Sequence, residues 1–115
     1  MATLKIILIP AFAFAALGAA ALPAQAVDAA AASALARKGA CMACHTVNNK
    51  MVGPAYKDIA KKYAGDANAP AYLAKKIRTG GSGVWGAVPM PPQASLSDAE
   101  IGTLVDWVLA GAPAK

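Results

Sequence analysis

Three chemically reactive side chains stand together in this sequence, at Cys41, Cys44 and His45. They are the only two cysteines and the only histidine among its 115 residues. Two thiols separated by two residues and followed directly by an imidazole form the attachment signature of a c-type haem. The thiols can add to the two vinyl groups of one haem, and the imidazole can bind the iron as its proximal ligand. The motif therefore predicts one covalently bound haem c.

Three other uses of a Cys-x-x-Cys pair compete with this interpretation. A thioredoxin-like redox pair belongs in a βαβ setting, and the sequence shows no alternation of strands and helices. A zinc site normally takes four protein ligands, whereas this motif offers three. A plain disulfide would leave His45 without a role. Haem attachment is the interpretation that uses all three side chains.

The first 26 residues have the pattern of a secretory signal peptide. Lys5 supplies the positive start, residues 6–22 form an apolar run without a charge, and residues 24–26 (AQA) offer a small-residue cleavage site. An uncleaved membrane anchor is the alternative, but the run is slightly short for a membrane span. We therefore expect cleavage after residue 26, a periplasmic location, and one domain over residues 27–115 without membrane insertion.

The size and charge of that domain limit its function. Domains of about this length often borrow stability from a metal or a cofactor, and a buried haem would supply part of the core. Without Lys5 the chain keeps ten basic and six acidic residues, a net charge of +4. This charge is too modest and dispersed to indicate nucleic-acid binding. A mildly basic face that meets acidic partner proteins fits it better.

Capping residues and helical spacing predict two helices in the first half of the domain. The first covers residues 28–38, with Asp28 as its N-cap and Gly39 at its end. The second covers residues 54–63, where apolar side chains recur at spacings of three and four. The members of that face are Tyr56, Ile59, Ala60 and Tyr63.

Two further helices are predicted after a turn at residues 65–68. One runs over residues 69–79 with a proline at its first position and an inner stripe of Tyr72, Leu73 and Ile77. The last begins with a capping box of Ser97 and Glu100. Its apolar stripe consists of Ile101, Leu104, Val105, Val108 and Leu109, and Trp107 is expected to pack at the edge of that stripe. No strand pattern is present, so we expect an all-α domain.

Residues 80–96 lack any periodic pattern and form a long loop for so small a domain. Long loops of this kind are usually functional or disordered, and the apolar side chains within this one argue against disorder. We therefore expect the loop to wrap a ligand.

This loop also supplies a candidate for the sixth iron ligand. A second histidine is absent, which leaves a thioether, a lysine amine or an open position. Met42 and Met51 lie too close to His45 in sequence to reach the other face of a haem easily. Met90 follows His45 by 45 residues, and its neighbouring prolines restrict the loop. Met90 is therefore the predicted distal ligand, and His/Met ligation favours an electron carrier over a catalyst.

Several segments resemble the class I cytochromes c of the small bacterial c-551/c-552 type. They are residues 41–45 (CMACH), 51–60 (MVGPAYKDIA), 83–86 (GVWG) and 89–92 (PMPP). The resemblance covers nearly all of the domain. It implies an all-α cytochrome c fold of four to five short helices wrapped around one covalently bound haem.

The resemblance also implies roles for single residues. The Pro54 carbonyl would accept a hydrogen bond from the second ring nitrogen of His45, which fixes the orientation of a ligating imidazole. Trp85 and Arg78 would donate hydrogen bonds to a haem propionate. Gln93 stands where the family has Asn or Gln near the methionine sulfur.

The function implied by the resemblance is that of a monomeric periplasmic electron carrier rather than an enzyme. Its partners would be redox proteins: a cytochrome bc1-type donor, and nitrite reductase, cytochrome c peroxidase or a terminal oxidase as acceptor. The alternative is a haem enzyme or gas sensor with an open or labile distal site. Peroxide chemistry there would need a distal acid–base group, and no second histidine provides one.

Overall fold

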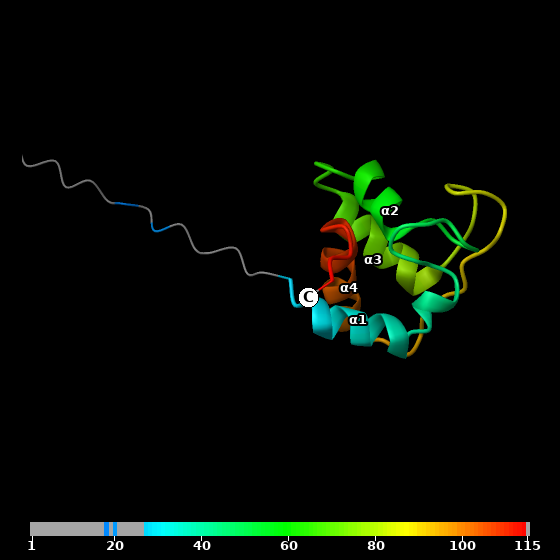
Figure 1. The fold of residues 1–115 in the computed structure, drawn as a ribbon, viewed down its shortest axis with the longest axis horizontal. Coiled ribbons are helices and arrows are strands. Elements are labelled where there is room, and N and C mark those ends of the chain that lie inside the picture. Colours follow the sequence, from blue (N-terminus) through cyan, green and yellow to red (C-terminus); the bar gives the residue numbers. More distant parts are fainter. Residues whose placement is uncertain (1–17, 19, 21–26, 115) are drawn as a thin grey trace, which may run out of the picture.

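A computed structural model of the chain describes residues 18, 20 and 27–114. The predicted signal peptide, residues 1–26, lies outside the described residues apart from positions 18 and 20. The described chain forms helices α1 (Ala29–Lys38), α2 (Tyr56–Lys62), α3 (Ala69–Thr79) and α4 (Asp98–Leu109), and a 3₁₀ turn η1 (Cys41–Ala43) (Figure 1). Its one element of β pairing is an isolated antiparallel bridge between Gly81 and Met90. The prediction of an all-α domain is confirmed.

Helix α4 is the centre of this arrangement, because α1, α2 and α3 all pack against it (Figure 1). Its start follows from local chemistry. The Ser97 hydroxyl accepts a hydrogen bond from the Glu100 backbone N–H at 3.1 Å, and a Glu100 carboxylate oxygen accepts one from the Ser97 N–H at 2.8 Å. This predicted capping box satisfies two backbone donors that the first helical turn leaves unpaired.

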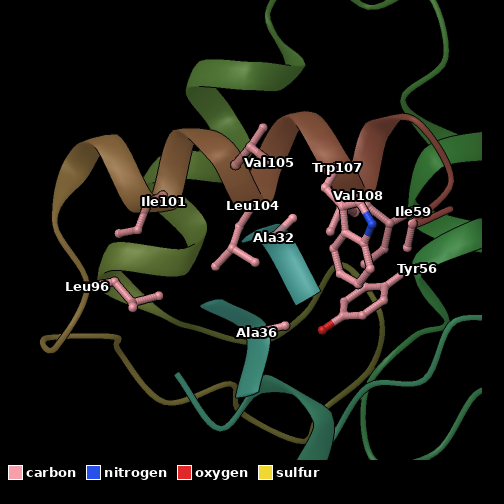
Figure 2. Packing of buried hydrophobic residues seen from close by; sticks show 11 residues of the cluster. Ala32, Ala36, Tyr56, Ile59, Leu96, Ile101, Leu104, Val105, Trp107 and Val108 are labelled. Atoms are coloured by element: carbon pink, nitrogen blue, oxygen red, sulfur yellow. The ribbon is translucent and has the colours of Figure 1, made fainter. Parts of the chain in front are cut away.

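The core lies along α4, where its apolar stripe meets alanines of α1 and an aromatic side chain of α2 (Figure 2). Ala32 and Ala36 are fully buried, so small side chains bring α1 close to α4. Trp107, expected at the edge of the stripe, lies in the core instead and is only 4% exposed. Three helices cover α4, which widens its buried face beyond one narrow stripe. The Trp107 indole donates a hydrogen bond to the Pro113 carbonyl at 3.0 Å, so its burial leaves no polar atom unpaired.

Helix α2 starts two residues later than predicted, because Ala55 keeps an extended backbone and precedes the helix as its N-cap. The backbone N–H groups of Tyr56 and Lys57 donate to the carbonyls of Thr46 and Val47, at 2.9 and 3.1 Å, and hold this segment against the chain after the cysteines. Helix α3 has the predicted bounds. Of its predicted inner stripe, Leu73 and Ile77 pack on the core, and Tyr72, which is 39% exposed, faces the cavity described below. No helix in the described part of the chain has the length and apolar character needed to cross a membrane.

Candidate functional site

A cavity of about 580 Å³ lies between the segment that carries the cysteines and the loop that connects α3 with α4. Its volume falls within the range of about 300–1,000 Å³ that is typical of sites for small molecules and cofactors. Six residues singled out from the sequence line it: Cys41, Cys44, His45, Pro54, Trp85 and Met90. The segments that supply these residues lie up to 49 positions apart, and the fold brings them to one cavity.

The turn η1 places the two thiols at this cavity. The backbone N–H groups of Cys44 and His45 both donate to the Cys41 carbonyl, at 3.1 and 3.0 Å, and so wind the motif into one turn. Both cysteines are free thiols and half-buried. Burial raises the pKa of the Cys41 thiol above its usual value. The pair is therefore not consumed in a disulfide and remains available for covalent attachment.

Three neighbours fix the imidazole of His45. Its Nδ1–H donates to the Pro54 carbonyl at 2.7 Å. The Tyr56 ring stacks on it, with centroids 5.3 Å apart and planes inclined by 16°. The backbone of Gly53 approaches so closely that a Cβ there would lie 2.6 Å from the His45 Cε1. With Nδ1 engaged, Nε2 is the nitrogen that remains for a metal.

The backbone of the loop holds Met90 in place from both sides. The N–H of Met90 donates to the Gly81 carbonyl at 2.9 Å, and the Gly81 N–H donates to the Met90 carbonyl at 3.0 Å. Two residues later the chain is anchored again, where the Gln93 N–H donates to the Ile77 carbonyl at 3.0 Å. Gly80 has a positive φ of 68°, and a Cβ there would collide with the Met90 carbonyl. Met90 is thus attached firmly to the end of α3.

The residues assigned to the propionate and to the methionine sulfur divide into two groups. Trp85 lines the cavity and is 40% exposed. Arg78 does not line it, because its guanidinium donates to the Gln93 carbonyl at 2.9 Å and pairs with Asp98 at 2.7 Å. The Gln93 amide donates to the Gly39 carbonyl at 2.8 Å and accepts from Ser95, so it is also engaged away from the cavity.

The cation that α3 presents to the cavity is Lys76, which sequence reasoning missed. The signal was available, because Lys76 lies three residues after Leu73 and four after Tyr72 and so shares their face of the helix. Arg78 stands on another side of α3. Lys50 is the second cation in the cavity wall, and none of the lining residues is acidic.

These residues fit a covalently bound haem. The wall combines two free thiols, an oriented imidazole, an anchored thioether and mostly apolar side chains, with lysine ammonium groups for carboxylates. Soft sulfur and imidazole ligands are those that bind haem iron in cytochromes c. No group of three or more His, Cys, Asp or Glu side chains suited to a metal ion occurs among the described residues.

Comparison with known proteins leads to the same site. A family model described as "Cytochrome c" matches residues 29–112. Cytochrome c-552 of Hydrogenobacter thermophilus is 60% identical over 75 residues, which cover 65% of this chain and 76% of that protein. Cytochrome c-551 of Pseudomonas aeruginosa is 59% identical over 69 residues, covering 60% of this chain and 65% of that protein. The crystal structure of wild-type Nitrosomonas europaea cytochrome c552 matches with a TM-score of 0.64 and 56% identity, over 67% of this chain and 95% of that one.

Proposed function

Because this chain belongs to the cytochrome c family, we propose that it is a periplasmic one-electron carrier whose haem iron is bound by His45 and Met90. The family itself accounts for the coarser part: a small class I cytochrome with covalently bound haem c that transfers electrons. The observation that supports the ligand pair is that His45 and Met90 line one cavity and are each held by backbone hydrogen bonds.

Each group of the chain has a defined task in this proposal. The bound haem supplies the chemistry, because its iron gains or loses one electron. Cys41 and Cys44 hold the group through thioether bonds, and Pro54 keeps the His45 ring in one orientation. The Met90 sulfur, as a soft ligand, raises the reduction potential. Burial raises the pKa of the Tyr56 phenol well above its usual range, so this neighbour of His45 stays neutral.

The composition of the cavity wall supports a carrier over an enzyme. General acid–base catalysis at a distal site needs a positioned proton donor or acceptor, most often a histidine or a carboxylate. His45 is the single histidine of the chain, and its Nδ1 is already engaged. None of the lining residues is an aspartate or a glutamate. An open-site haem enzyme would therefore lack the usual acid–base group.

The partners belong to the same proposal. The chain without residues 1–26 would carry a net charge of +4, which favours contact with acidic redox proteins. A cytochrome bc1-type donor is proposed, and nitrite reductase, cytochrome c peroxidase or a terminal oxidase is the proposed acceptor. The carrier would act as a monomer after cleavage of residues 1–26. Mass spectrometry of the periplasmic protein should find Val27 at its N-terminus.

The decisive experiment is an optical comparison of the haem-loaded protein with two methionine variants. The wild type should be low-spin and show the red charge-transfer band of methionine bound to ferric iron. Met90→Ala should lose that band and bind carbon monoxide readily in the ferrous state. Met51→Ala, which removes another methionine from the cavity wall, is the matched control and should keep the band. Ready carbon monoxide binding by the wild type would instead favour the open-site alternative.

A further inference from the structure

The loop between α3 and α4 is held at its base but scarcely at its tip. The base carries the paired hydrogen bonds of Gly81 and Met90. The tip, residues 82–89, is exposed throughout. Its one backbone hydrogen bond is internal, from the Gly83 N–H to the Gly86 carbonyl at 2.7 Å. No hydrogen bond joins the tip to the rest of the described chain, but one side-chain contact of Trp85 does connect it with α2.

Lys62, the last residue of α2, makes that contact. Its Nζ lies 5.6 Å from the centre of the Trp85 ring and 5.9 Å from the centre of the Tyr63 ring. An ammonium within about 6 Å of an aromatic centroid is attracted by the negative face of the ring. Lys62 has no ion pair among the described residues, whose two salt bridges use other cations. Its charge is therefore available to the two rings.

The contact belongs to a longer series of neighbouring cations and aromatic rings. The Tyr63 and Tyr72 rings lie 5.6 Å apart, and the Lys76 Nζ is 5.9 Å from the centre of the Tyr72 ring. The series thus connects the loop tip at Trp85 with α2 and then with α3. Four of its five members line the cavity, and Lys62 alone does not. Lys62 therefore contacts two side chains of the wall without lining the cavity itself.

We propose that Lys62 is a positioning residue, whose ammonium holds the Trp85 ring and with it the loop tip against the end of α2. This holding is separate from the anchors of Met90 at the base. The inference rests on the proposed function at one point: when haem occupies the cavity, Trp85 faces it. Loss of the Lys62 charge should release the tip and leave the base in place.

The test is amide hydrogen exchange, measured by NMR on the reduced, haem-loaded protein with Lys62→Gln. Exchange of the Gly83 amide reports on the tip, and exchange of the Gly81 and Met90 amides reports on the base. An exposed cation–π contact is weak, so we expect Gly83 to exchange about two- to five-fold faster. The Gly81 and Met90 amides should keep their rates. Lys62→Arg, which retains the charge, should behave as the wild type.

Lys61→Gln is the matched control, because it removes an equal charge from the same end of α2 at an exposed neighbour. This variant should leave the Gly83 exchange rate unchanged. The proposal is overturned if Lys61→Gln accelerates Gly83 as much as Lys62→Gln does, or if Lys62→Gln has no effect. Equal acceleration at Gly81 and Met90 would overturn the separation of tip and base.

A second measurement distinguishes this inference from the proposed function. Lys62→Gln should retain the red charge-transfer band, because Met90 is anchored at the base. Absence of that band from the wild type would refute the ligand pair, while the exchange rates would still decide the role of Lys62. In a double variant with Trp85→Leu, Lys62→Gln should cause no further acceleration at Gly83. Additive effects would show that Lys62 does not act through Trp85.

Discussion

The Nδ1 atom of His45 lies 2.7 Å from the carbonyl oxygen of Pro54 and donates a hydrogen bond to it. The two residues are nine positions apart, and the backbone hydrogen bonds from Gly53 to Cys44 and from Tyr56 to Thr46 bring their segments together. A ring held in this way presents the same nitrogen in both oxidation states of a bound iron. If His45 binds the iron as proposed, little rearrangement should accompany electron gain or loss.

Gly53→Ala should disturb this arrangement directly. The new Cβ would lie 2.6 Å from the His45 Cε1 and 2.9 Å from its Nδ1, so the imidazole must move. We expect a smaller low-spin fraction and a loss of about 1–3 kcal/mol in the free energy of unfolding. Gly102→Ala is the control, because its Cβ meets nothing within 4 Å in the interior of α4. That variant should gain about 0.5–1 kcal/mol. A Gly53→Ala protein with an unchanged spectrum would contradict the tight packing of the ring.

Gly80→Ala should release Met90 from its proposed position on the iron. Both Gly80 and Gly86 have positive φ angles, of 68° and 122°, so alanine strains the backbone at either site. A Cβ at Gly80 also collides with the Met90 carbonyl, whereas one at Gly86 meets nothing within 4 Å. Backbone strain of this kind amounts to about 1–3 kcal/mol. Absorption spectra of the ferric, haem-loaded variants should show a weakened charge-transfer band in Gly80→Ala and an intact one in Gly86→Ala.

Lys76→Gln should lower the reduction potential more than Arg78→Gln does. Lys76 lines the cavity, and a cation there favours the more negative, reduced state of the site. If its charge contributes about 1 kcal/mol, the change is about 40 mV for one electron. Arg78 is engaged with Asp98 and the Gln93 carbonyl, so its loss should affect stability more than potential. Protein-film voltammetry would decide, and a larger shift in Arg78→Gln would restore the assignment made from the sequence.

Glu100 should make part of the stability dependent on pH. Its hydrogen bond to Lys38, at 2.8 Å, and the Ser97 backbone N–H lower the pKa of its carboxyl below the usual value of 4.5. Because the pKa is lower in the folded state than in the unfolded state, ionised Glu100 stabilises the folded protein above pH 4.5. This stabilisation is lost as the pH falls through the pKa of the folded state. Denaturant unfolding of Glu100→Gln should therefore show reduced stability at pH 7, and the difference should disappear in acid. A difference that persists at low pH would indicate a cause other than ionisation.

Local signals were sufficient to predict most of the fold. Asp28, Gly39 and the box of Ser97 and Glu100 act through hydrogen bonds within a few residues, so the ends of α1 and α4 can be read from the sequence. The start of α2 could not, because Thr46 and Val47 hold the preceding segment extended through contacts that no local pattern shows.

Only some of the residues at the cavity could be predicted from the sequence. The cysteines, His45 and Met90 carry their chemistry in their identity and spacing, and all of them line it. Arg78 was assigned by resemblance alone, although the helical phase of α3 points to Lys76. The pairing of Arg78 with Asp98 joins two helices, and no spacing within α3 reveals it.

The hydrogen bond from Gln93 to Gly39 has a consequence for the order of assembly, because it joins residues 54 positions apart. Closing a loop of that length costs about 3.5 kcal/mol in chain entropy, and the chain bears this cost before any stabilising contact forms. The turn from Cys41 to His45 forms through hydrogen bonds across three or four residues and needs no such closure. The thiols can therefore be presented on a chain that is still open. We therefore expect attachment to come first and enclosure by the distal loop to follow.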